Sequence, residues 1–192
     1  RPSELWVCDL RSLRLCRMAE GSPVAANARR DAVYYIASGD GPARLMRLDL
    51  AELSIREIHR FEGEAPATGA VSPDERWFLG GPFPVRENRY RLVRIDLRSG
   101  AAQPFCELED MMNPHLQFEP SAGRYCMVQI NRGAMRNPVT GGQRLAGRLG
   151  ATLALIEVET GAVLSLPVGR PHTYGITGHE CWAGDTGRLL FT

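Results

Sequence analysis

Three of the four histidines in this sequence lie in two short polar segments, and their residue types could support metal chemistry. His115 stands two positions before Gln117, while His172 and His179 bracket a segment rich in Gly and Thr. Imidazole nitrogens together with amide or carboxylate oxygens suit a divalent first-row metal such as Mn²⁺, Fe²⁺ or Zn²⁺. A metal site that includes these residues is therefore one interpretation.

The same residues also have a purely structural interpretation. Their spacing is wide and matches no compact ligand motif, and such histidines can simply donate hydrogen bonds to loop carbonyls. Glu180, next to His179, is expected at a strand position, where it points to the opposite face and pairs with an Arg. The elements on which these residues lie decide between the two interpretations.

Composition and charge exclude several classes of protein. The 192 residues are 44% hydrophobic, and 23 basic residues nearly balance 22 acidic ones, for a net charge of +1. This balance argues against nucleic acid as the main partner, because phosphate binding needs a concentrated basic surface. The apolar runs are far shorter than the roughly 20 residues of a membrane span. We expect no membrane partner, and no motif sets the oligomeric state.

Five cysteines are present in an odd number and at wide spacings, without any C-x-x-C pair. This arrangement argues against a zinc ribbon or a redox motif. Most of them have apolar neighbours, where a free Cys behaves as a small core residue. Together with the absence of a signal segment, this favours a reduced, cytoplasmic setting.

Two strand–turn–strand elements alternate along the chain and predict its fold. In the first, an apolar strand ends in an acid and a turn, and a short second strand follows, in the segments 5–15, 45–58, 92–105 and 153–166. In the second, a small-residue strand and a turn precede an apolar or aromatic strand, in the segments 24–36, 69–79, 117–128 and 180–191. Together they make four short antiparallel strands per unit, which is the content of a β-propeller blade.

The expected fold is therefore all-β, a β-propeller region spanning residues 1–192 with about four blades. We expect blade units at about 1–18, 19–62, 63–108, 109–168 and 169–192, with the stretch 132–150 as a loop inserted within a blade. The outer units are half-blades. They either close a small ring between them or belong to a larger ring, and the abrupt ends favour a stretch of a larger ring.

A propeller would bring the polar segments together. The innermost strand of each blade lines the central channel, and the loop leading into it opens on one face of the ring. Alternation along that strand would place His115 and Gln117 on the same side. Two imidazoles and an amide carbonyl then converge at one channel mouth.

Two segments resemble the oligogalacturonate lyase family, whose members are seven-bladed propellers related to the TolB type. One is His115-x-Gln117-Phe118-x-Pro120, and the other is 178–182 (Gly-His-Glu-Cys-Trp) followed by Asp185-x-Gly187. The family pattern is His-x-Gln-Phe-Ser-Pro, then His-Glu-Gly, then Gly-His-Glu-Phe/Trp with a Pro-Asp-Gly turn. The resemblance covers the whole chain for the fold and these two segments for function.

The resemblance implies a lyase of pectin breakdown that cleaves oligogalacturonate, or a related uronate oligosaccharide, by β-elimination. A metal ion, Mn²⁺ by preference, would neutralise the substrate carboxylate, and a His would remove the C5 proton. By position, His115 would be the base, and His179 and His172 the metal ligands. Gln117 would be a polar contact to the substrate. Arg86 and Arg89 could clamp its carboxylate, although an ordinary solvated surface loop is the favoured interpretation of both Arg residues.

The sequence also departs from the family pattern. It has Asn131-Arg132-Gly133 where the family has His-Glu-Gly, and the turn after Trp182 lacks the usual Pro. Two other functions therefore stay open. One is a non-catalytic TolB- or WD40-like propeller that binds a protein or another ligand. The other is a different metal-dependent enzyme on the same scaffold, because fold alone does not decide function.

Overall fold

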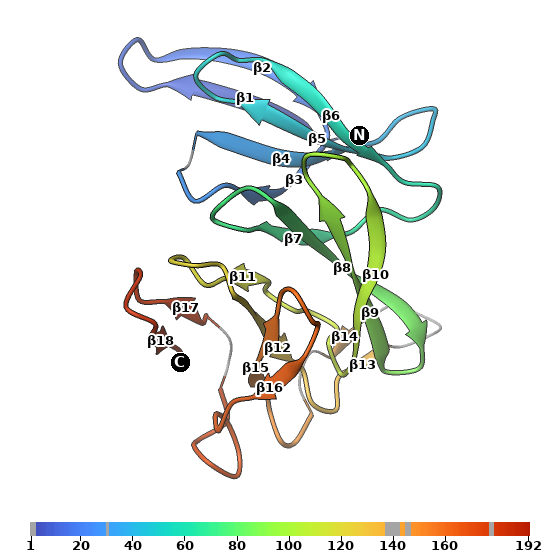
Figure 1. Cartoon of the computed structure of the whole chain (residues 1–192), viewed down its shortest axis with the longest axis vertical. Helices are drawn as coiled ribbons and strands as arrows, with labels where there is room; N and C mark the ends of the chain where they lie inside the picture. The colour runs from blue at the N-terminus through green and yellow to red at the C-terminus, as the bar shows by residue number, and fades with distance from the viewer. Residues whose placement is uncertain (1–2, 30, 137–142, 145–146, 177–178) are drawn as a thin grey trace.

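The computed structural model describes residues 3–29, 31–136, 143–144, 147–176 and 179–192, and these residues form strands, turns and loops without any helix. Figure 1 shows the sheets following one another along an arc, with the β1–β2 hairpin at one end and the β17–β18 hairpin at the other. None of the described residues belongs to a helix that is long and apolar enough to cross a membrane.

Three four-stranded antiparallel sheets make up the centre of the chain, in the orders β3-β4-β5-β6, β7-β8-β9-β10 and β11-β12-β15-β16. The first two are meanders of consecutive strands, whereas in the third an insertion separates β12 from β15 in the chain. The strand bounds are as follows: β3 (Ser22–Ala26), β4 (Ala32–Ala37), β5 (Arg44–Asp49), β6 (Ile55–Arg60), β7 (Thr68–Val71), β8 (Trp77–Arg86), β9 (Arg89–Asp96), β10 (Ala102–Glu109), β11 (Gln117–Phe118), β12 (Tyr125–Ile130), β15 (Thr152–Glu157) and β16 (Val163–Ser165). The expected all-β class with four-stranded antiparallel blades is confirmed.

Two-stranded sheets stand at both ends of the arc. β1 (Glu4–Asp9) pairs with β2 (Arg14–Glu20), and β17 (Cys181–Trp182) pairs with β18 (Leu189–Leu190). Large apolar side chains are exposed on both hairpins, including Trp6, Leu15 and Leu190. Such exposure is what a sheet face shows when nothing packs against it.

The stretch 132–150 contains a short hairpin where the sequence predicted only a loop. β13 (Met135–Arg136) pairs with β14 (Gln143–Arg144) between β12 and β15. Arg132, at the start of the stretch, donates hydrogen bonds to the carbonyls of four residues: Leu149, Gly150, Ala151 and Arg170. A guanidinium has five N–H donors, so this one side chain joins the start of the stretch to its end at residues 149–151 and to Arg170.

The acid that recurs in the first repeat ends a strand and stabilises the turn after it. Asp9, Asp49 and Asp96 each accept hydrogen bonds from the main-chain N–H groups two and three positions later. These bonds favour the ionised carboxylate, so the pKa of each of the three groups lies below its ordinary value. The repeat in the sequence is therefore a repeated Asx turn.

The core lies between adjacent sheets. Phe78 and Leu79 are neighbours on β8, and both are fully buried. Phe78 packs with Tyr34 and Ile95 toward the preceding sheet, while Leu79 packs with Val128 toward the following one. Because successive side chains of a strand point to opposite faces, one strand joins two hydrophobic layers.

The first strands of the three central sheets come together. β3 adjoins β7, and β7 adjoins β11. With Trp182 of β17, their residues line a cavity of about 460 Å³ whose lining is mostly small and apolar, including Ala26, Gly69, Ala70 and Leu116. The expected candidate site lies at the N-terminal end of β11, beside this cavity.

Candidate active site

His115 lies in the loop that leads into β11, not on the strand itself. The strand begins at Gln117, and His115 has a positive φ of 45°. The alternation argument that placed His115 and Gln117 on one strand face therefore does not apply to His115. The loop is held in place because Pro114 accepts a hydrogen bond from the Gln129 N–H at 2.7 Å and Leu116 is buried.

A carboxylate distant in the sequence contacts this imidazole. His115 Nδ1 lies 3.0 Å from Oε1 of Glu180, which is 65 residues away along the chain. The Glu180 side chain is completely buried, whereas that of His115 is 40% exposed. The pair thus joins a fixed carboxylate to an imidazole that a ligand can reach.

The expectation for Glu180 was wrong. Glu180 precedes β17 and follows His179, whose φ of 61° turns the chain, so strand alternation does not set its direction. The carboxylate points inward to His115 rather than outward to an Arg. The Gly-His-Glu-Cys-Trp motif marks the segment, but no local pattern in the sequence reveals a partner 65 residues away.

Gln117 ties the Glu180 segment to β11. Its side-chain Nε2 donates to the main-chain carbonyl of Glu180 at 2.8 Å. The main-chain carbonyl of Gln117 accepts a hydrogen bond from the indole N–H of Trp182 at 3.2 Å. Gln117 was predicted to contact the substrate. In the structure, one N–H of its side chain instead fixes the backbone at Glu180.

The other ring nitrogen of His115 faces Asn113. Asn113 Nδ2 lies 2.8 Å from His115 Nε2, and the Asn113 main-chain N–H donates to Asn131 Oδ1 at 2.8 Å. Asn131 is fully buried. The departure from the family pattern at Asn131 therefore has a structural role, because this residue holds the loop that contains the candidate base.

The two predicted metal ligands, His172 and His179, are exposed. The His172 N–H closes a turn onto the Gly169 carbonyl at 2.9 Å. Within the described part of the chain, no three or more His, Cys, Asp or Glu side chains form a group that could hold a metal ion. These residues do not by themselves fit a metal centre, so we derive no step from a metal, and the two ligands stay predictions.

The predicted carboxylate clamp is apart from His115, on the β8–β9 hairpin. Arg89 forms ion pairs with Glu107 at 3.2 Å and Glu109 at 3.6 Å. Hydrogen bonds from Arg91 and Arg89 hold the pKa of the Glu107 carboxyl below its ordinary value. Arg89 is therefore already engaged with two carboxylates.

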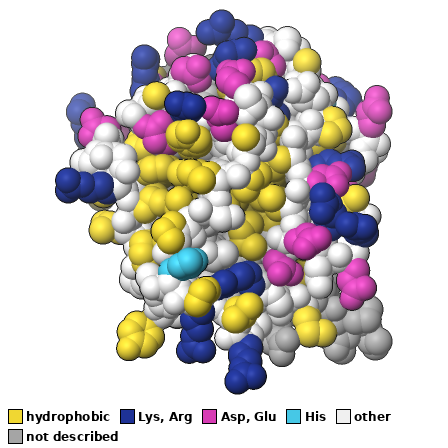
Figure 2. All heavy atoms as spheres, turned by 60° about the horizontal axis from the view of Figure 1, so that its bottom comes forward, with side chains coloured by type: hydrophobic (Ala, Val, Ile, Leu, Met, Phe, Trp, Pro, Cys, Tyr) yellow, Lys and Arg dark blue, Asp and Glu magenta, His cyan; other side chains and the backbone are white. Residues whose placement is uncertain are grey.

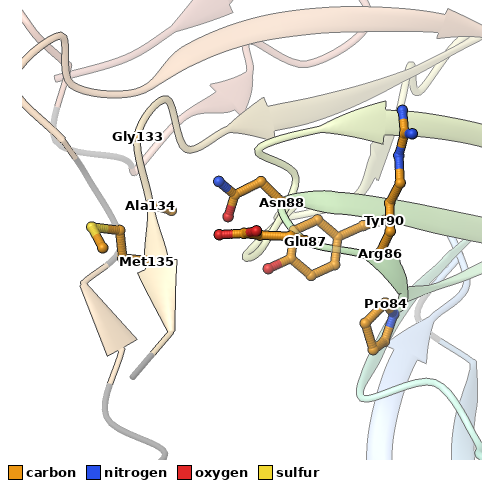
Figure 3. A pocket seen from close by; sticks show the side chains of 8 residues that line it. All are labelled: Pro84, Arg86, Glu87, Asn88, Tyr90, Gly133, Ala134 and Met135. Atoms are coloured by element: carbon orange, nitrogen blue, oxygen red, sulfur yellow. The ribbon is translucent and has the colours of Figure 1, made fainter. Parts of the chain in front are cut away.

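Arg86 lines a separate cavity of about 550 Å³ between this hairpin and the segment 133–135. Figure 3 shows Glu87 and Asn88 pointing toward that segment, whereas Arg86 points away from it. An acidic and an amide side chain thus face the segment 133–135, and we find no described contact between either Arg and the His115–Glu180 pair.

No protein-family model matches the sequence, and no curated protein matches it. Solved structures do match. An oligogalacturonate lyase in complex with manganese superposes with a TM-score of 0.65 at 19% identity, over 97% of this chain and 51% of that one. TolB from Acinetobacter baumannii superposes with a TM-score of 0.53 at 14% identity, over 85% of this chain and 48% of that one.

A putative TolB from Agrobacterium tumefaciens gives a TM-score of 0.55 at 13% identity, over 79% of this chain and 51% of that one. The fold is that of a TolB-like β-propeller. The chain spans about half the length of these three structures, so the sheets described above form part of a ring. Identities this low show the fold alone.

Proposed function

We propose that the chain is part of a propeller lyase that cleaves a uronate-containing oligosaccharide by β-elimination, with His115 as the base. One observation supports this proposal above all. His115 is a half-exposed imidazole that directly precedes Leu116, a residue lining the cavity of the inner strands, and a buried carboxylate holds one of its nitrogens. A general base needs this combination of access and orientation.

In the proposed reaction, every proton and every electron pair can be followed. Nε2 of His115 takes the C5 proton, which is acidic because it lies α to the uronate carboxylate. The C5–H electron pair becomes the C4–C5 double bond, and the bond from C4 to the glycosidic oxygen breaks. That oxygen leaves with the bonding pair and takes the proton from the imidazolium, directly or through one water, which restores the neutral base.

The test is turnover of short oligogalacturonates with added Mn²⁺, followed by the ultraviolet absorbance of the unsaturated product. His115→Gln is expected to lower the rate by about 10²–10⁴-fold, the usual contribution of a general base. His59→Gln is the matched control, because His59 is a partly buried imidazole whose Nδ1 faces the Gly100 carbonyl at 2.8 Å. No product from the wild-type protein would refute the lyase proposal.

A binding scaffold is the second candidate, and the apolar surface supports it. The inner-strand cavity is lined mainly by small and apolar residues. Figure 2 shows hydrophobic side chains gathered across the middle of one face, bordered by charged side chains. A scaffold of this kind would bind a protein or another ligand without turnover, and His115→Gln would leave that binding unchanged.

A further inference from the structure

The contacts at the two ring nitrogens of His115 are chemically different. Nδ1 faces Glu180 Oε1 at 3.0 Å, and an ionised carboxylate can only accept hydrogen bonds. Nε2 faces the Asn113 amide nitrogen at 2.8 Å, and an amide NH₂ can only donate. Both contacts are satisfied by a single neutral tautomer, with the proton on Nδ1 and the lone pair on Nε2.

The Glu180 carboxylate is placed rigidly enough to select that tautomer. Its side chain is completely buried, and its main-chain carbonyl is held by Gln117 at 2.8 Å. His115 and His179 both have a positive φ, a backbone state that a non-glycine residue keeps only where its surroundings enforce it. The backbone on both sides of the pair is thus constrained.

Among the buried side-chain atoms of the described chain that lack a hydrogen-bond partner, one belongs to a carboxylate, the second oxygen of Glu180. Oε2 is buried and lacks a hydrogen-bond partner within the part of the chain that the structure describes. A buried carboxylate is costly unless it is paired, and His115 is the partner that the structure provides. Retaining such a group indicates a role other than stability.

We propose that Glu180 is the positioning residue of this site. It holds His115 in the Nδ1–H tautomer and turns the Nε2 lone pair toward the substrate, which displaces the Asn113 amide when it binds. The catalytic consequence rests on the proposed lyase function, whereas the tautomer is a property of the folded chain and can be measured without turnover.

The tautomer is measured first, on the full chain. Selective ¹⁵N labelling of histidine gives signals from four imidazoles, and the loss of one set in His115→Gln assigns His115. Long-range correlation spectra, at a pH where the ring is neutral, are expected to show a protonated Nδ1 and an unprotonated Nε2. The opposite tautomer would overturn the proposal.

Two variants then separate positioning from packing. Glu180→Gln keeps an oxygen that accepts from Nδ1–H, whereas Glu180→Leu keeps the bulk and loses the acceptor. Glu180→Leu is expected to mix the tautomers and to lower kcat about 10–100-fold without changing KM, as the loss of an orienting partner does. Glu180→Gln is expected to restore the tautomer and most of kcat.

The matched control is Glu159→Gln, whose carboxylate is exposed and pairs with Arg76 at 3.1 Å. It should change neither the tautomer nor kcat. Unchanged turnover in Glu180→Leu would remove the role of Glu180 and leave the lyase proposal standing. An inactive wild-type protein would remove the reaction, and the role of Glu180 in it, even with the expected tautomer observed.

Discussion

The side-chain amide of Gln117 donates to the main-chain carbonyl of Glu180 over 2.8 Å, and this bond joins β11 to the segment before β17. It crosses from one sheet to the next, as the neighbouring positions of β11 and β17 in Figure 1 illustrate. The bond positions the buried carboxylate beside His115, so the candidate site depends on contacts between sheets as well as on its own side chains.

Replacing Gln117 by Leu is expected to destabilise the protein by about 1–3 kcal/mol, because the buried carbonyl of Glu180 then loses its donor. Urea unfolding monitored by Trp fluorescence measures the change. The His115 imidazole signals should also broaden or shift, since the carboxylate next to it becomes mobile. Equal stability of the variant and the wild type would contradict the structural role of Gln117.

Replacing Gly69 by Ala is expected to destabilise the core by about 1–3 kcal/mol, the usual cost of overpacking. A Cβ at this position would overlap the fully buried ring of Phe78. Gly63→Ala is the matched control, because no atom lies within 4 Å of the position its Cβ would take. A similar melting temperature for the two variants would show that the first and second strands of the sheet pack more loosely than described.

Replacing Asp96 by Asn is expected to weaken the acid sensitivity of the fold. The pKa of Asp96 lies below its ordinary value of 3.8, chiefly because the Ser99 main-chain N–H donates to the carboxylate. The ionised form therefore stabilises the native state above the unfolded pKa. That contribution is lost as the pH falls through the lower folded pKa.

The measurement is the urea midpoint as a function of pH, from neutral down to below the ordinary pKa of Asp. The wild type should lose more stability over this range than Asp96→Asn, which has no carboxylate to protonate at this turn. Parallel curves for the two proteins would refute the prediction.

Mn²⁺ binding is expected to depend on His179 and His172. Two imidazoles alone form an incomplete site, so titration calorimetry of the wild type against Mn²⁺ should give a weak binding isotherm. His179→Ala should weaken binding further, by about tenfold or more, because it removes a direct ligand. His59→Gln should bind as the wild type does. An absence of heat with the wild-type protein would refute the prediction that Mn²⁺ binds. Identical isotherms for the wild type, His179→Ala and His59→Gln would refute the role of His179 as a ligand.

Local patterns were sufficient to predict the strands of the repeat, although not the β13–β14 hairpin. Each apolar run that ended at Asp9, Asp49, Asp96 or Glu157 is a strand, because alternation and Asx turns act over a few residues. The same reasoning failed at His115 and Glu180. Both lie in loops next to positive φ angles, where period-2 alternation no longer indicates direction.

The sequence by itself determined the four-stranded repeat and the polar segments from which a site could be built, since turn chemistry and burial patterns are written in neighbouring residues. Only the tertiary structure decided which of those residues meet. It joined His115 to Glu180 across 65 residues, and it set Arg86 and Arg89 on a separate hairpin. The reason is physical: packing one sheet against the next selects long-range partners, and no local preference encodes that choice.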